Sequence, residues 1–150
     1  MKRIYFNEKY CMACRLCEIA CLVAHSKSKK IIKAYKEEYP FLKPRLIIEE
    51  KGHVSFAIQC RHCKDAPCVT ACVSGAMHRH KSGEIIHNEK KCVGCWMCVM
   101  VCPFGVIIRD LKGKKVVAKC DLCSDLGQPA CVDACPNAAL VYGEDKDNEK

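Results

Sequence analysis

Residues 92–103 read CVGCWMCVMVCP: four cysteines, separated by two, two and three residues, with a proline directly after the last. Residues 11–21, CMACRLCEIAC, repeat this spacing without the proline. Two looser groups of four cysteines lie at 60–72, with gaps of two, four and three residues, and at 120–135, with gaps of two, seven and three. These four groups include all 16 cysteines of the 150-residue chain.

So many cysteines in a chain of this length have two common explanations, a disulfide scaffold or bound metal. Disulfide scaffolds belong to secreted proteins, which begin with a charged segment followed by an apolar one. The first residues, MKRIYFNEK, are too polar for such a signal, and no apolar run long enough to span a membrane follows. We therefore expect a cytoplasmic protein that binds metal through its cysteines and does not insert into a membrane.

The spacing C-x2-C-x2-C-x3-C-P is the one by which bacterial ferredoxins bind [4Fe–4S] clusters. Cysteines at positions i, i+3 and i+6 reach three irons of one cubane, whereas the fourth cysteine ligates the neighbouring cluster. The groups must therefore work in pairs. We expect four [4Fe–4S] clusters, with all sixteen cysteines as iron ligands.

The segments between the groups indicate how they pair. Residues 76–78 and 85–86 flank the turn-forming segment 81–83, so a hairpin joins the second group to the third. We expect strands at 54–58 and 106–108 to close this inner unit. Terminal strands at 3–6 and 140–142 then close an outer unit with the first and fourth groups. Single helical turns are expected after the fourth cysteine of a group, as at 21–25 and 72–77.

The expected fold is α+β with little regular secondary structure: two bacterial-ferredoxin-like units, each for two clusters, one inserted in the other. The outer unit comprises residues 1–51 and 113–150, and the inner unit residues 52–112. Residues 26–51 contain no cysteine and form a connecting segment that covers part of the surface. The apolar side chains of this segment argue against a disordered linker.

The exchange of the fourth cysteine predicts four ligand sets. In the inner unit the sets are Cys60, Cys63, Cys68 and Cys102, and Cys92, Cys95, Cys98 and Cys72. In the outer unit they are Cys11, Cys14, Cys17 and Cys135, and Cys120, Cys123, Cys131 and Cys21.

Zinc is the main alternative for the metal. Zinc sites use two cysteine or histidine pairs, four ligands per ion, and leave no place for the central cysteine of a C-x2-C-x2-C run. The fourth group, with its gap of seven residues, remains the candidate for a single zinc site.

The formal net charge of +8, from 25 Lys+Arg against 17 Asp+Glu, raises the alternative of nucleic-acid binding. Bases usually stack on aromatic side chains beside a basic groove, and only Tyr35 and Tyr39 lie near the lysines at 27–36. We expect no nucleic-acid partner. A solvated loop or a docking surface for an acidic protein explains these lysines equally well.

Other residues near the cysteines have simpler roles. We expect His62, inside the second group, to lie beside a cluster and tune its reduction potential rather than to ligate iron. Trp96 and Met97 are expected to shield their cluster from water. The sequence contains no glycine-rich phosphate loop and no nucleophile–base pair. We therefore expect no catalytic centre and no enzyme activity of its own.

The chain resembles the four-cluster ferredoxin-like subunits of multi-subunit redox enzymes, above all the iron–sulfur proteins associated with carbon monoxide dehydrogenase. The resemblance rests on residues 11–18, 25–29, 59–63, 91–96, 119–123 and 135–142 and covers the chain from Cys11 to Cys135. Two departures are Leu22 and Val73, which stand where many ferredoxins have a proline.

The resemblance implies electron transfer between a nickel–iron carbon monoxide dehydrogenase and a hydrogenase or another oxidoreductase. It also implies the same pairing of outer and inner groups. The alternative within this superfamily is the iron–sulfur subunit of a formate dehydrogenase or other molybdenum or tungsten oxidoreductase. The chain lacks the long C-terminal extension of membrane-anchored relatives, so we expect no membrane-anchor partner.

Overall fold

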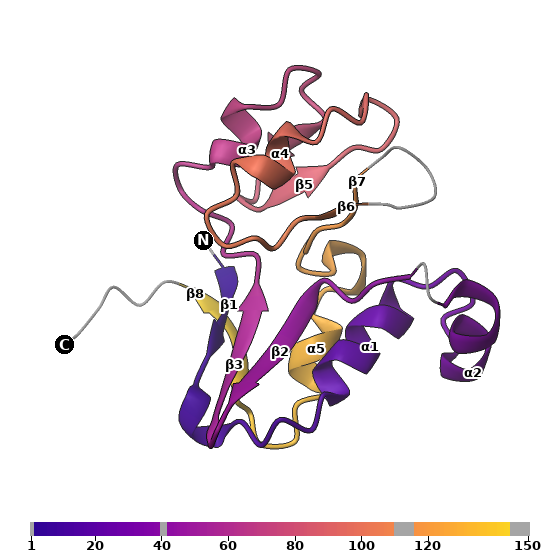
Figure 1. Ribbon diagram of the computed structural model, residues 1–150, viewed down its shortest axis with the longest axis vertical. Coiled ribbons are helices and arrows are strands. Elements are labelled where there is room, and N and C mark those ends of the chain that lie inside the picture. Colours follow the sequence, from indigo (N-terminus) through magenta and orange to yellow (C-terminus); the bar gives the residue numbers. More distant parts are fainter. Residues whose placement is uncertain (1, 40–41, 110–115, 145–150) are drawn as a thin grey trace.

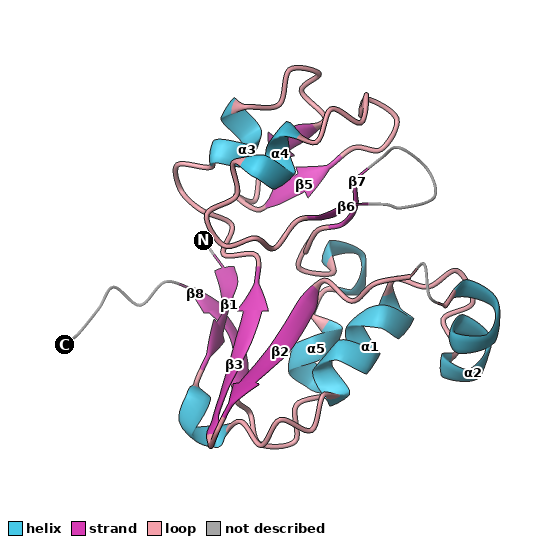
Figure 2. Ribbon diagram, in the orientation of Figure 1, coloured by secondary structure: helices cyan, strands magenta, loops and turns pink. Residues whose placement is uncertain are grey.

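The computed structural model describes residues 2–39, 42–109 and 116–144 (Figures 1 and 2). The strands are β1 (Lys2–Phe6), β2 (Leu46–Lys51), β3 (Val54–Gln59), β4 (Met77–Arg79), β5 (Ile85–His87), β6 (Ile108–Arg109), β7 (Val116–Ala118) and β8 (Leu140–Glu144). The α-helices are α1 (Leu16–Ala24), α2 (Ile31–Lys33), α3 (Pro67–Thr70), α4 (Met97–Met100) and α5 (Ala130–Asp133). The 3-10 helices are η1 (Glu8–Tyr10) and η3 (Ser124–Leu126), and η2 (Ala34–Glu38) is a π-helix. Regular structure is sparse, as expected for a mixed α and β fold of this kind.

Two of the predicted strand pairs are confirmed. Strands β1 and β8 pair antiparallel, with Phe6 opposite Leu140, so the N-terminal strand and the C-terminal strand lie together. Strands β4 and β5 form the predicted hairpin, with Met77 opposite His87. Its turn contains Gly83, whose φ of 101° lies in a region that only glycine adopts readily.

The predicted pairing of the strand before Cys60 with the strand after Cys102 is wrong. Strand β3 pairs with β2, and β6 pairs with β7. Strands β2 and β3 are joined by a two-residue loop that begins with Gly52, whose φ is 63°, and closing so short a loop costs little entropy. This hairpin crosses the boundary predicted between residues 51 and 52.

The helical turns also differ from the prediction. Helices α3, α4 and α5 each begin one residue before the third cysteine of their group and end before the fourth, rather than following the fourth. Only in the first group does the helix, α1, continue past the fourth cysteine. The segment from 26 to 51 is ordered where it is described, as expected, and contains α2, η2 and β2.

Buried residues form two separate cores. One core contains Ile4, Leu46, Ile48, Ala57, Leu122 and Leu140 together with Cys17, Cys21 and Cys131. The other contains Ala66, Met77, Ile85, Val106 and Ile107 together with Cys68 and Cys98. In Figure 1 the elements of the first core lie in the lower part of the molecule, and α3, α4 and β5 lie in the upper part. Each core therefore combines aliphatic side chains with thiols.

None of the helices in the described part of the chain is both long and apolar enough to cross a membrane.

Candidate metal centres

A cavity brings the first cysteine group together with one distant cysteine. Cys11, Cys14 and Cys17 line it on one side and Cys135 on the other, with Ile48 among the apolar residues between them. Burial raises the pKa of the Cys17 thiol to about 11, and charge interactions with Cys135 and Cys14 add to this effect. Four sulfurs in an apolar cavity form a donor set suited to soft metal ions.

A second cavity, also lined by four cysteines, lies in the upper part of the molecule. Cys92, Cys95 and Cys98 line it together with Cys72 from the preceding group. Burial raises the pKa of Cys98 to about 11, and Cys72, Cys92 and Cys95 are the cysteines that add to it. Trp96 also lines the cavity, whereas Met97, for which the same shielding role was expected, is exposed and does not.

The remaining eight cysteines form two further groups. Burial raises the pKa of Cys68, and the cysteines whose charges act on it are Cys60, Cys102 and Cys63. Burial likewise raises the pKa of Cys131. Charge interactions with Cys120, Cys21 and Cys123, followed by Cys17, raise it further. Each group thus contains three cysteines of one sequence run and the fourth cysteine of another.

The first turn of every cysteine group has the same strained backbone. The residue directly before the second cysteine has a positive φ in all four: Ala13 at 54°, His62 at 46°, Gly94 at 73° and Leu122 at 59°. Three of these residues are not glycine, so the conformation is costly and persists only where the surroundings require it. Such turns point successive backbone N–H groups toward one centre, which favours a bound anionic group.

Backbone amides also reach three of the fourth cysteines. The N–H groups of Arg45, Met77 and Ala139 donate to the sulfurs of Cys21, Cys72 and Cys135, at N···S distances of 3.3, 3.2 and 3.2 Å. Hydrogen bonds to cysteine sulfur stabilise the thiolate and are one determinant of cluster reduction potentials.

Two buried histidine nitrogens favour a bound inorganic group. His62 is fully buried, and its Nδ1 accepts a hydrogen bond from the Ile85 amide at 3.0 Å, so Nε2 carries the proton. Burial lowers the pKa of His62 to about 3, which keeps the ring neutral. Nε2 of His62 and Nε2 of His87 have no hydrogen-bond partner in the described part of the chain, and His87 lines the second cavity. The inorganic sulfides of a cluster would supply the hydrogen-bond acceptors that these two nitrogens lack.

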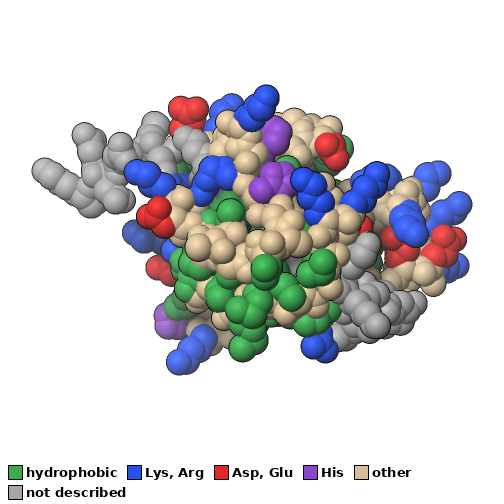
Figure 3. Space-filling view, turned by 90° about the horizontal axis from the view of Figure 1, so that it is seen from above, with side chains coloured by type: hydrophobic (Ala, Val, Ile, Leu, Met, Phe, Trp, Pro, Cys, Tyr) green, Lys and Arg blue, Asp and Glu red, His purple; other side chains and the backbone are tan. Residues whose placement is uncertain are grey.

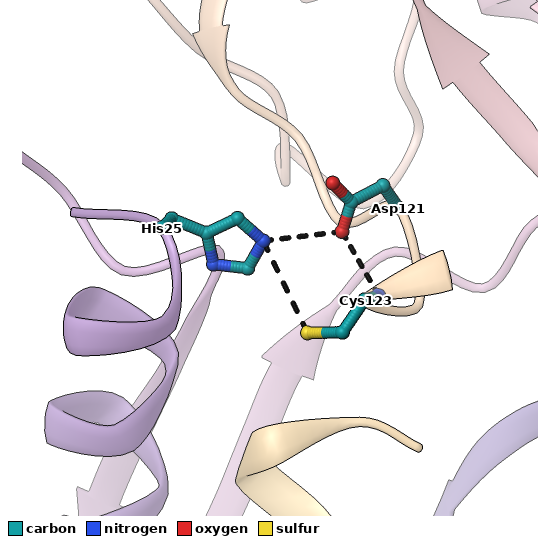
Figure 4. A group of neighbouring side chains, drawn as sticks. All are labelled: His25, Asp121 and Cys123. Carbon is teal, nitrogen blue, oxygen red and sulfur yellow. Dashed lines mark hydrogen bonds and ion pairs between the residues drawn. The ribbon is translucent and has the colours of Figure 1, made fainter. Parts of the chain in front are cut away.

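One group that no sequence pattern indicated is formed by His25, Asp121 and Cys123 (Figure 4). Nε2 of His25 lies 3.1 Å from Oδ1 of Asp121 and 4.0 Å from Sγ of Cys123, while Nδ1 lies 2.7 Å from the Cys21 carbonyl oxygen. Both ring nitrogens thus face acceptors, as in an imidazolium. Burial lowers the pKa of His25, but the hydrogen bonds to Asp121, Cys123 and Cys21 outweigh it and raise the pKa to about 11.

The carboxylate of Asp121 already accepts hydrogen bonds from several protein groups. It accepts from the guanidinium of Arg45 and, at 3.0 Å, from the amide of Cys123. Although burial raises the pKa of Asp121, the hydrogen bond from His25 and the charge of Arg45 hold it well below its usual range. The group is therefore an ion-pair network beside cysteines 21 and 123 rather than a separate metal site.

Comparison with known proteins identifies the family of the chain. A family model described as a 4Fe-4S dicluster domain matches residues 52–145. The chain belongs to the 4Fe-4S dicluster domain family. Among curated members of similar length is an iron-sulfur protein of Rhodospirillum rubrum, 40% identical over 152 residues, which cover 91% of this chain and 79% of that protein.

Two further relatives of this dicluster chain have names that describe electron transfer. The electron transport protein HydN of Escherichia coli strain K12 is 36% identical, over 87% of this chain and 81% of that protein. The thiosulfate reductase electron transfer subunit PhsB of Salmonella typhi is 35% identical, over 95% of this chain and 76% of that protein.

Solved structures show a similar fold at low sequence identity. A chain of the active site complex BamBC of benzoyl coenzyme A reductase, in complex with benzoyl-CoA, matches the whole dicluster chain with a TM-score of 0.53 and 21% identity, over 83% of its own length. The same complex as isolated gives a TM-score of 0.52 and 18% identity, over 99% of this chain and 82% of that chain. This likeness concerns the fold alone.

Proposed function

We propose that the chain is an electron-transfer subunit with four [4Fe–4S] clusters that carries single electrons between a redox enzyme and a second oxidoreductase. The observation that carries the proposal is the exchange of cysteines around common cavities. Cys135 completes the cavity lined by the first group, and Cys72 completes the cavity lined by the third. A structural zinc site, built from two neighbouring pairs, requires no such exchange. The names of HydN and PhsB support the same function.

The proposed ligand sets are those predicted from the spacing. They are Cys11, Cys14, Cys17 and Cys135; Cys21, Cys120, Cys123 and Cys131; Cys60, Cys63, Cys68 and Cys102; and Cys72, Cys92, Cys95 and Cys98. The two cavities support the first and last sets, and the charge interactions of Cys131 and Cys68 support the other two.

The proposed nested arrangement follows from the two cores. Cysteines of the first and fourth groups lie in or against one core, and cysteines of the second and third groups lie in or against the other. The inner unit therefore sits between the two halves of the outer unit in sequence. Hairpin β2–β3 connects them, because Ala57 belongs to the first core and Ile58 packs against the second.

When bound, [4Fe–4S] clusters supply one-electron storage at each site. We infer that the ligand sets lie in a row. The charge interaction between Cys60 of the inner unit and Cys120 of the outer unit supports placing these two sets next to each other at the junction. The other two sets then lie at the ends of the row, and each contains an exposed cysteine, Cys95 or Cys14. We propose these ends as the points of electron entry and exit.

The upper end has an apolar surface suited to a protein partner. Val73, Val93, Met97 and Met100 are exposed, and all lie within or next to the runs that line the cavity with Cys95. Figure 3, seen from above, shows hydrophobic side chains gathered on one side of this face. Exposed apolar groups around a redox centre favour close contact with a partner, which brings the donor and acceptor together.

For the partner we propose carbon monoxide dehydrogenase, on the resemblance of the cysteine-flanking motifs. A formate dehydrogenase or another molybdenum or tungsten oxidoreductase is the alternative. A cytoplasmic location is proposed because reduced cysteines suit that compartment.

The surroundings of the lysines at 27–36 argue against nucleic-acid binding more strongly than the sequence alone does. Tyr35 and Tyr39 stack on each other, with ring centroids 5.2 Å apart, and Glu37 and Glu38 line the same surface as the lysines.

The deciding experiment is a metal and sulfide analysis of protein prepared without oxygen. Four [4Fe–4S] clusters per chain are expected, with reduction in separate one-electron steps followed by EPR spectroscopy. Half that iron content, together with stoichiometric zinc, would overturn the four-cluster proposal. Partner choice is tested separately by reduction of the protein with purified carbon monoxide dehydrogenase and carbon monoxide, with formate dehydrogenase and formate as the comparison.

A further inference from the structure

Lys119 connects the two cores through a buried side chain. It directly precedes Cys120 in the fourth cysteine group, and only 4% of the residue is exposed. Its Nζ donates to the carbonyl oxygen of Cys120 at 2.8 Å and also to the carbonyl oxygen of Ile85, in strand β5 of the other core. Figure 1 shows β7, which ends one residue before Lys119, where the upper and lower parts of the molecule meet.

The charge of Lys119 has no protein counter-ion among residues 2–39, 42–109 and 116–144. Both acceptors of its ammonium group are neutral carbonyls, and no carboxylate lies within ion-pair distance. A buried, unpaired cation is costly, so its presence calls for negative charge nearby. A cluster held by four thiolates is such a negative group.

The contacts of Lys119 extend to both sides of the junction. Its Nζ donates to the carbonyl oxygen of Cys120, a member of one proposed ligand set. Ile85, the other acceptor, belongs to the core that contains Cys68, and its amide donates to His62, which stands between Cys60 and Cys63. Lys119 therefore lies where the sets of Cys60 and Cys120 meet.

We propose that Lys119 is a positioning residue for electron transfer between the two units, raising the reduction potentials of both facing clusters. The inference rests on the proposed function, because it requires clusters at the sets of Cys60 and Cys120. Reduction adds negative charge to a cluster, and a fixed positive charge in a low-dielectric site stabilises that form. Because one charge serves both clusters, an electron is stabilised on either side of the junction.

The test is EPR-monitored redox titration of full-length, four-cluster protein carrying Lys119→Gln, which removes the charge and keeps hydrogen-bond donors. Two of the four midpoint potentials should fall by about 59 mV each. For one electron, this corresponds to a tenfold decrease in the equilibrium constant for reduction. The other two should not move. Lys119→Arg, which retains the charge, should keep all four near their original values.

Lys91→Gln is the matched control. Lys91 precedes Cys92 in the third group as Lys119 precedes Cys120, but it is exposed to solvent. The proposal is overturned if Lys119→Gln moves no potential, moves all four equally, or shifts them no more than Lys91→Gln does.

Loss of iron from Lys119→Gln while Lys119→Arg retains four clusters would assign Lys119 to cluster retention and would also overturn a role in setting potentials. Failure of the unmodified protein to bind four clusters is a different result. It contradicts the proposed function and is visible before any variant is made.

Discussion

Nε2 of His25 lies 3.1 Å from Oδ1 of Asp121, although 96 positions separate the two residues in the chain. The histidine follows helix α1, and the aspartate lies inside the first turn of the fourth cysteine group. The contact ties the first group to the fourth beside Cys21 and Cys123, two cysteines of one proposed ligand set. A positive ring at the end of α1 also interacts favourably with the helix dipole.

Asp121→Asn should weaken this tie. It removes the charge that holds His25 and Arg45, and hydrogen bonds to charged groups contribute about 1.5–3 kcal/mol each. We expect cluster loss from anaerobic protein in denaturant to be at least about tenfold faster, measured as bleaching of the brown absorbance. Asp125→Asn, at an exposed position in η3, is the control and should bleach at the original rate. Equal rates for both variants would contradict a stabilising role.

Cys102→Ser should disturb the same cluster as Cys63→Ser. The prediction follows from the charge interactions of Cys68 with both Cys63 and Cys102. EPR spectra of the reduced variants, compared with unmodified protein, should lack or alter one common signal. Cys95→Ser, in the same sequence run as Cys102, should alter a different signal. If Cys102→Ser instead matches Cys95→Ser, the ligands do not cross and the proposed sets are wrong.

Removal of iron should unfold the chain. The two cores contain few large aliphatic side chains and are completed by thiols, and metal binding and folding are coupled where ligands alone do not form a core. Chelation of iron under anaerobic, reducing conditions should abolish both the cooperative thermal transition and protease resistance. Circular dichroism and limited proteolysis measure the two effects. A sharp transition in the iron-free, reduced chain would show that the fold does not depend on its clusters.

Glu38 should hold the lysine-rich segment in a pH-dependent manner. Its carboxylate accepts from the Lys27 amide at 3.1 Å and from the Ser28 amide at 3.3 Å, and the Lys27 hydrogen bond is the main cause of its lowered pKa. Because the folded-state pKa is lowered, the stabilisation is present above the unfolded value of 4.5 and is lost as the pH falls through the folded-state pKa.

Glu38→Gln should therefore speed hydrogen exchange at the Lys27 and Ser28 amides near neutral pH, as measured by NMR or mass spectrometry. Glu37→Gln changes the neighbouring exposed carboxylate and is the matched control. Unchanged exchange in Glu38→Gln would show that these hydrogen bonds do not hold the segment.

The cysteine spacing alone was enough to predict the kind of cofactor and the short, sparse elements. Ligation of a cubane by a C-x2-C-x2-C run is a matter of local geometry, because each cysteine is only three residues from the next. The β4–β5 hairpin was predictable for the same reason, since its turn and both strands lie within a few residues of each other. The pairing of β1 with β8 followed from the groups they flank.

Interactions between distant segments needed the tertiary structure. The pairing of β3 with β2 is an exception, because a two-residue loop makes it local; the prediction missed it by pairing the strands that flank the second and third cysteine groups. No local pattern places His25 beside Asp121. The sequence shows Lys91 and Lys119 alike, each before the first cysteine of a group. Only the packing of two cores against each other exposes one lysine to water and buries the other between them, where the low dielectric makes its charge matter.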